Sequence, residues 1–283
     1  MPTDATALSL AFQTLLFVPG SRMDRVAKAH ATDADIVAID LEDAVPEAEK
    51  DAAREGVLHF LATDATVRTA VRINGLRTRA GLQDLLAFSG TDSSPGIVLV
   101  PMVESPVELD IFNAAFNGKA VSVVPIVETV KGLSAVVAIG QSANVANVMF
   151  GGGDFSSQMG VDLAWEPLFH ARSRFVMQCV EAGVRAVDVP YIHIKDDTGL
   201  EEETQRVKSL GFSAKALIHP NQAAIVKTAL KPTASELERA AQAVAAYHQA
   251  GGGAIMHQGV MLDEPIVRRM ESLLKLNEGA GNA

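Results

Sequence analysis

Short apolar runs alternate with longer segments of helical periodicity along most of the chain. The runs are rich in Val, Ile and Leu without strict polar alternation, which is typical of strands buried on both faces of a parallel sheet. Eight such runs occur, at residues 15–18, 36–41, 70–73, 97–101, 121–127, 145–150, 186–189 and 216–218. Eight strands that are each followed by a helix predict an α/β fold, the (β/α)8 TIM barrel. An open doubly wound sheet is the alternative, but so many units in this length favour closure.

Start and stop signals support the helices between the runs. Ser105 followed by Pro106 predicts a helix start, because serine caps the first turn and proline fits the first helical position. Another helix is predicted over residues 201–210, with Gly211 ending it.

The pattern changes after Lys231. A helix is predicted over residues 233–249, three consecutive glycines end it, and a final helix follows a short mixed stretch. We therefore expect two domains, a barrel over residues 14–231 and a C-terminal helical extension over residues 232–283. The glycine triplet is a natural hinge within the extension.

Composition narrows the classes of function. Hydrophobic residues make up 48% of the 283 residues, so the chain can bury a large core. The formal net charge of −10 argues against nucleic acid and anionic membranes as partners, and no apolar run reaches the length of a membrane span. The first residues lack the basic segment of a secretory signal, and the single cysteine, Cys179, cannot form an internal disulfide. We therefore expect a cytoplasmic protein.

Polar side chains follow the carboxyl ends of the predicted strands, where (β/α)8 barrels carry their active sites. This set comprises Ser21, Arg22, Asp40, Glu42, Asp43, Arg72, Asn74, Glu128, Asp154, His219 and Asn221. Five carboxylates at one barrel mouth repel one another unless a cation lies among them. An all-oxygen ligand set suits magnesium or manganese, whereas the scattered histidines show no zinc spacing.

Glu128 and Asp154 are the candidate metal ligands. Glu128 ends an apolar run, and the alternative is an acidic residue in the first turn of a helix, where it would stabilise the dipole. Asp154 follows three glycines, which could instead form a turn that the aspartate caps. Their places on neighbouring strands favour the metal site.

Asp40 and Arg72 are the other charged candidates. Asp40 and Glu42 lie on the same side of an extended strand, with a solvated acidic loop as the alternative. Arg72 is flanked by apolar strand residues, so its charge needs a partner, either a protein carboxylate or that of a substrate. A structural ion pair inside the barrel would satisfy Arg72 equally well.

Six short motifs follow one another in an order that matches a known family. They are Leu16-Phe-Val-Pro-Gly, Asp40-Leu-Glu-Asp-Ala-Val, Val71-Arg-Ile-Asn, Ile126-Val-Glu-Thr, Gly-Gly-Asp154 and Ile218-His-Pro-Asn-Gln. The chain resembles the citrate lyase beta-subunit group of the HpcH/HpaI aldolase superfamily, whose relatives include malyl-CoA and citramalyl-CoA lyases. The resemblance covers nearly the whole chain.

The resemblance implies a barrel with a C-terminal lid, in homotrimers or hexamers, that cleaves a β-hydroxy acyl thioester of coenzyme A or an acyl carrier protein. It implies a magnesium ion held by Glu128 and Asp154, with Arg72 and Glu128 facing the substrate and Asp40 near the metal's water ligands. It also implies acid/base work by Asp263, in the lid motif Gly259-Val-Met-Leu-Asp263. The alternative for Asp263 is the N-cap of the last helix.

One position departs from the family pattern. Many members carry Pro-Lys at the end of the fourth strand, where this chain has Pro101-Met102, so a cation near the site is missing. The substrate therefore stays open among citramalyl-CoA, malyl-CoA and citryl thioesters. Two alternatives to the lyase are a 2-keto-3-deoxy acid aldolase of the same superfamily and a non-catalytic subunit of a citrate-lyase-like complex.

Overall fold

The computed structural model describes residues 11–280, with side chains described as far as residue 275. Eight parallel strands pair in chain order and close into a barrel, in which β8 pairs with β1. The strands are β1 (Thr14–Pro19), β2 (Ile36–Asp40), β3 (Thr69–Arg72), β4 (Ile97–Val100), β5 (Ser122–Val127), β6 (Asn147–Phe150), β7 (Arg185–Asp188) and β8 (Ala214–Leu217). The predicted (β/α)8 barrel is confirmed, and the open doubly wound sheet is excluded.

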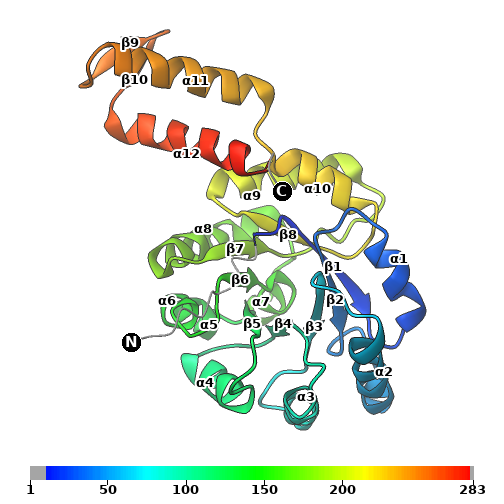
Figure 1. Ribbon diagram of the computed structural model, residues 1–283. Coiled ribbons are helices and arrows are strands. Elements are labelled where there is room, and N and C mark those ends of the chain that lie inside the picture. The colour runs from blue at the N-terminus through cyan, green and yellow to red at the C-terminus, as the bar shows by residue number, and fades with distance from the viewer. Residues whose placement is uncertain (1–10, 281–283) are drawn as a thin grey trace. The chain divides into compact units, whose positions relative to one another are not determined.

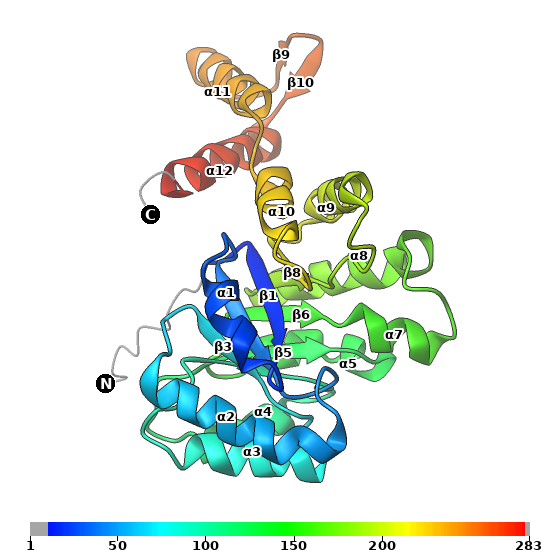
Figure 2. The same ribbon diagram turned by 90° about the vertical axis from the view of Figure 1, so that its right-hand side faces the viewer.

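Helices connect the strands on the outside of the barrel (Figure 1). They are α1 (Val26–His30), α2 (Lys50–Thr63), α3 (Arg79–Ser89), α4 (Pro106–Ala115), α5 (Val130–Ser134), α6 (Val136–Gly140), α7 (Gly152–Met159), α8 (Trp165–Ala182), α9 (Asp197–Leu210) and α10 (Gln222–Leu230). The short 3-10 turns η1 (Met23–Arg25) and η2 (Glu47–Glu49) precede α1 and α2. Helices that follow consecutive strands lie side by side, as α2 and α3 do in Figures 1 and 2.

The structure confirms the predicted start of one helix and shows that another helix starts earlier than predicted. Ser105 caps α4 and forms a capping box with Glu108, which confirms the predicted start. Helix α9 begins earlier than predicted, because Asp196 caps it by accepting a hydrogen bond from the Gly199 N–H at 2.9 Å. Gly211 ends α9 in the left-handed region, at φ +108°, as predicted.

Side chains at alternate strand positions fill the inside of the barrel. The buried strand residues of this interior core are Leu15, Ile36, Ala38, Ala70, Ile97, Leu99, Val124, Ile126, Met149, Val187, Ala214 and Ala216, and Phe12 before β1 also belongs to it. The positions between them face the surrounding helices and are also mostly buried, which explains the continuous apolar runs. Two residues further along, the same interior series reaches Asp40, Arg72, Glu128 and Gly151 at the carboxyl end of the barrel.

A buried ion cluster lies on the outward side of β7 and β8, and the sequence did not reveal it. Lys215 is fully buried and donates hydrogen bonds to Asp188 Oδ2 at 2.6 Å and to Glu203 Oε1 at 2.8 Å. Arg172 Nε donates to the other oxygen of Asp188 at 2.9 Å. Burial disfavours the charge of Asp188, but the two cations outweigh burial and hold its pKa below the usual range.

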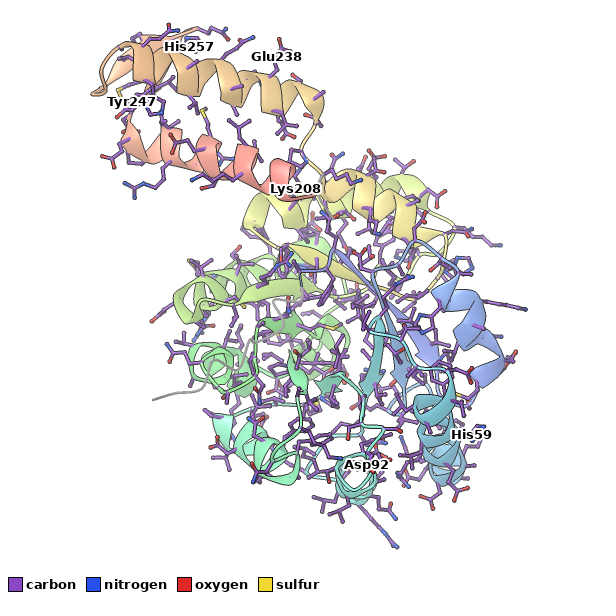
Figure 3. All side chains as sticks on the ribbon, viewed as in Figure 1. His59, Asp92, Lys208, Glu238, Tyr247 and His257 are labelled. Atoms are coloured by element: carbon purple, nitrogen blue, oxygen red, sulfur yellow. The ribbon has the colours of Figure 1, made fainter. Side chains whose placement is uncertain are left out.

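The chain divides after Lys227 into two compact units. The second unit contains α11 (Ala234–Gln249), a hairpin of β9 (Ile255–His257) and β10 (Val260–Leu262), and α12 (Glu264–Ala280). Its small core consists of Ala243, Leu262 and Val267, and Tyr247, which Figure 3 labels on α11, packs against it. The functional domain limits of 14–231 and 232–283 stay a prediction.

Capping residues and glycines explain where the elements of the second unit begin and end. Thr233 caps α11 in a capping box with Glu236, in agreement with the predicted helix. The three glycines at 251–253 all have positive φ, so the helix cannot continue through them. The mixed stretch after them is a β-hairpin, which the sequence did not predict; positive φ at Gln258 and Gly259 indicates its tight turn.

The single cysteine and the length of the helices bear on two further expectations. Cys179 is buried on α8, and burial raises the pKa of its thiol to about 12, so it acts as a packing residue. Within the part of the chain that the structure describes, no helix combines the length and apolarity of a membrane span.

Candidate active site

Charged side chains occupy the last interior positions of several barrel strands. Asp40 ends β2, Arg72 ends β3, and Glu128 comes directly after β5. Asp40 and Arg72 are register partners on neighbouring strands, so their side chains point the same way. The barrel therefore collects these charges at the carboxyl end, where the sequence placed them.

Arg72 and Asp40 form a bidentate ion pair. Arg72 Nε donates to Asp40 Oδ1 at 2.7 Å, and Nη2 donates to Oδ2 at 2.6 Å. The Asp40 oxygens also accept hydrogen bonds from the backbone N–H groups of Glu42 and Ala44. Asp40 thus holds the plane of the guanidinium and is itself held by the loop that follows β2. This is the structural ion pair that the sequence allowed.

The other side of Arg72 meets two more carboxylates and an aromatic ring. Its Nη1 lies 2.9 Å from Glu42 Oε2 and 3.6 Å from Asp43 Oδ2, and the guanidinium carbon lies 4.9 Å from the centre of the Phe17 ring. Burial disfavours the charge of Arg72, but the Asp40 hydrogen bonds and the surrounding carboxylates keep its pKa above the usual value. Arg72 is therefore a permanently charged, fixed cation.

Glu128 is buried and is oriented by backbone. It precedes Thr129, whose hydroxyl caps α5 by accepting a hydrogen bond from the Gly132 N–H at 3.0 Å. Glu128 therefore lies before the helix, and the alternative of an acidic residue in its first turn is excluded. Glu128 Oε2 accepts a hydrogen bond from the Met102 N–H at 2.7 Å.

Asp154 is exposed in the first turn of α7, whose N-cap is Gly151. A carboxylate is favourable there because it faces the positive end of the helix dipole. Burial is the main cause that raises the pKa of Glu128 and of Asp43, and the charge of Asp154 adds to this effect. The sequence alternative, a glycine-rich turn capped by Asp154, is wrong: Gly152 and Gly153 are the first residues of α7, and Gly151 is its N-cap. The metal-ligand role of Asp154 stays a prediction.

The acidic groups carry more negative charge than Arg72 balances. Burial, together with neighbouring carboxylates, raises the pKa of Glu42 to about 9 despite the nearby Arg72. Burial likewise raises the pKa of Glu128 to about 7, although the Met102 N–H and Arg72 oppose it. Glu42 Oε2 is buried without a hydrogen-bond donor, since Arg72 Nη1 approaches it in poor hydrogen-bond geometry. Buried carboxylates that tend to hold protons are suited to exchange them for a divalent cation.

The oxygen ligands fit magnesium. Among the side chains that the structure describes, residues 11–275, no three of the types His, Cys, Asp and Glu gather into a complete ligand group. Magnesium does not need such a group, because it takes one or two protein carboxylates and fills its other positions with water and substrate oxygens. Glu128 and Asp154 would supply those two carboxylates.

Some polar residues expected near the mouth are engaged elsewhere. Asn74 is buried and donates to the carbonyl of Leu41 and to Asp84 Oδ2, so it is a structural residue. Arg22 is paired with Asp24 at the surface. The Asn74 pairing could not be read from the sequence, because Asp84 lies ten positions further along the chain, on α3.

Asp263 lies at the start of α12 in the second unit. Its Oδ1 accepts a hydrogen bond from the Ile266 N–H at 3.3 Å, so the N-cap reading applies. Its acid/base role stays a prediction.

The fold and the site together define a (β/α)8 barrel protein with an acidic, oxygen-rich cluster at the carboxyl ends of its strands. The chain belongs to the HpcH/HpaI aldolase/citrate lyase family, whose model matches residues 13–220. The suspected family is therefore confirmed.

Known relatives cover nearly the whole chain. The chain is 28% identical to the mitochondrial citramalyl-CoA lyase of Rattus norvegicus, covering 93% of this chain and 85% of that protein. It is 31% identical to the citrate lyase subunit beta of Leuconostoc mesenteroides subsp. cremoris, covering 93% and 92%. Among solved structures, the protein CitE of Mycobacterium tuberculosis in complex with magnesium, acetoacetate and coenzyme A is 31% identical. Its TM-score is 0.83, with 95% of this chain and 98% of that chain covered.

Proposed function

We propose that this chain is a magnesium-dependent carbon–carbon lyase that cleaves a β-hydroxy acyl thioester to an acetyl thioester and a 2-oxo acid. The observation that carries the proposal is the cluster of Asp40, Arg72 and Glu128 inside the barrel mouth, with Asp154 beside it. Relatives named citramalyl-CoA lyase and citrate lyase subunit beta support the reaction class. The CitE complex with magnesium and coenzyme A supports the metal and the thioester handle.

The proposed reaction breaks one carbon–carbon bond and moves protons from and to the substrate. The bond between the second and third carbons of the acyl chain breaks, and its electron pair passes to the second carbon as an acetyl thioester enolate. The hydroxyl group gives up its proton, so that its carbon becomes the carbonyl carbon of the 2-oxo acid. The enolate takes up one proton, so the reaction consumes and releases no proton overall. Glu128 and Asp154 would hold the magnesium ion, which when bound would polarise substrate oxygens as a Lewis acid.

Arg72 and Asp40 have positioning and binding roles in this proposal. Arg72 binds the carboxylate of the substrate or the charge that develops on the enolate, since its guanidinium is fixed and always charged. Asp40 holds Arg72 by two hydrogen bonds, so the guanidinium is pre-oriented before substrate arrives. Glu128 also faces the substrate.

Asp263 is the proposed acid that protonates the enolate. Asparagine caps a helix as well as aspartate does but cannot donate an acidic proton. Asp263→Asn should therefore keep the thermal stability of the protein while lowering kcat about 10²–10⁴-fold. Asp263→Ala, which also loses the cap, is the matched comparison. Wild-type turnover by Asp263→Asn would leave Asp263 with capping alone.

The direct test is an assay on three substrates, citramalyl-CoA, malyl-CoA and a citryl thioester. We expect cleavage of at least one of them with magnesium, loss of cleavage when EDTA is added, and recovery when magnesium is restored in excess. The acyl products are identified by mass spectrometry, because a lyase leaves the acetyl group on the thiol whereas simple hydrolysis releases the free thiol. Cleavage that continues in EDTA, or no cleavage of any of these thioesters, would contradict the proposal.

The finer expectations from the sequence belong to the same proposal. The handle is coenzyme A or an acyl carrier protein, and the CitE complex with coenzyme A favours the former. A homotrimer or hexamer in the cytoplasm is the expected form, from the family resemblance and the single cysteine.

A further inference from the structure

We propose that Gly151 is a positioning residue for Glu128. The absent side chain of Gly151 leaves the space in which the Glu128 side chain lies, and the Met102 N–H fixes the opposite carboxylate oxygen. This inference rests on the proposed function, in which Glu128 is a magnesium ligand, but its steric part can be tested without the metal.

The space above Gly151 is filled by Glu128. A Cβ atom built on Gly151 would lie 2.1 Å from Glu128 Cγ, 2.7 Å from Oε1 and 2.8 Å from Cδ. These separations are far below van der Waals contact, and three atoms of a buried side chain cannot all move aside cheaply. Any residue other than glycine at this position would therefore displace Glu128.

The backbone of Gly151 does not itself require glycine. Its φ of −91° and ψ of 74° lie on the negative side of φ, where other residues are tolerated. Its N–H donates to the Val127 carbonyl at 2.9 Å, which ties the end of β6 to the end of β5. The constraint at position 151 is thus the close approach of Glu128 and not the dihedral angles.

Met102 holds Glu128 from the other side through its backbone. Its φ of +56° is in the left-handed region, which residues other than glycine rarely adopt. In this conformation its N–H points to Glu128 Oε2, and the next residue, Val103, donates to the Ile126 carbonyl at 3.1 Å. The loop after β4 is therefore pinned to β5 beside Glu128.

These two constraints give the carboxylate one orientation. Oε2 is bound by the Met102 N–H, so Oε1 lies over Gly151, at the start of the helix that carries Asp154 three residues later. A ligand oxygen held by neighbouring backbone loses little freedom when the metal binds. Gly151 thus leaves room for Glu128 Oε1 beside the N-terminus of α7, the helix that carries the other proposed ligand in its first turn.

The first test compares two alanine variants in the same glycine triplet. Gly151→Ala should weaken magnesium binding about 10- to 100-fold by isothermal titration calorimetry, since it disturbs a residue that orients a ligand. Gly153→Ala is the matched control, because a Cβ there meets no atom within 4 Å, and it should bind magnesium like the wild type. Wild-type magnesium affinity in Gly151→Ala would overturn the proposal.

The second test is a double-mutant cycle on the metal-free protein. Gly151→Ala should lower the unfolding temperature in the wild-type background, but much less in Glu128→Ala, which lacks the atoms that clash. If Gly151→Ala alone does not fold, recovery of folded protein in the double variant supports the clash. An equal loss of stability, or of folding, in both backgrounds would overturn the proposal. Because this cycle uses no metal, it separates failure of the positioning role from failure of the magnesium-dependent function.

Discussion

Glu128→Gln and Asp154→Asn should each lower magnesium-dependent thioester cleavage on the order of 10³-fold. Each substitution keeps the shape of the side chain and removes one negative charge and one anionic ligand oxygen. Magnesium affinity should fall in parallel with turnover, because the proposed site offers only these two protein carboxylates. Calorimetric titration and steady-state assays on the same samples measure both effects.

Stability should move differently from activity in these variants. Burial raises the pKa of Glu128 to about 7, so above that pH the metal-free native state holds a carboxylate charge that its surroundings disfavour. At pH 8 without magnesium, Glu128→Gln should therefore unfold at the wild-type temperature or above it. If Glu128 had only a structural role, its replacement would instead lower the unfolding temperature of the protein.

Asp92→Asn is the charge-matched control for the metal-ligand variants. Asp92 is exposed in the loop before β4, at the amino end of that strand, and is labelled in Figure 3. It should retain full activity and magnesium affinity. Wild-type turnover in either Glu128→Gln or Asp154→Asn would refute the assigned ligand.

Lys215→Met should reduce the free energy of unfolding of the barrel by about 3–5 kcal/mol. Lys215 and Asp188 are both fully buried, and Lys215 Nζ makes three hydrogen bonds, to Asp188, Glu203 and the Val189 carbonyl. Methionine fills a similar volume but leaves the Asp188 charge buried with Arg172 as its remaining cation. The cost comes mainly from Asp188 and Glu203, which lose the hydrogen bonds and the positive charge of Lys215.

Urea unfolding followed by the fluorescence of Trp165 measures this loss. Trp165 is the only tryptophan of the chain, and the Arg172 guanidinium lies 5.5 Å from its ring, so the signal reports on the region of the cluster. Lys195→Met at an exposed position is the control and should change stability by less than about 0.5 kcal/mol. A loss below about 1 kcal/mol in Lys215→Met would show that this cluster is not a closed, dehydrated network.

The strands could be located from the sequence because both of their faces are buried. A run such as residues 97–101 is apolar throughout, since Leu99 faces the interior core and Val98 and Val100 face the helices. The β9–β10 hairpin was missed because its strands are three residues long and partly exposed, so no periodic signal arises. The early start of α9 was missed because its cap, Asp196, lies within a polar loop.

Part of the candidate site could also be predicted from the sequence. Position at a strand end indicated Asp40, Arg72, Glu128 and Asp154, because parallel strands of a barrel bring these ends to one face. Sequence position could not distinguish Asn74, which turns away to Asp84, from the residues that face the mouth. Their catalytic and ligand roles stay proposals.

By itself, the sequence determined the α/β class, the order of eight strands, the family and the set of charged strand ends. It could do so because buried strands are apolar along their whole length, and because the order of these segments is the order of the chain. Only the tertiary structure decided which groups meet: Arg72 with Asp40, Lys215 with Asp188, and the Glu128 side chain over Gly151. These contacts join residues 23 to 32 positions apart, and strand register and barrel closure set them. A single sequence contains no direct measure of either.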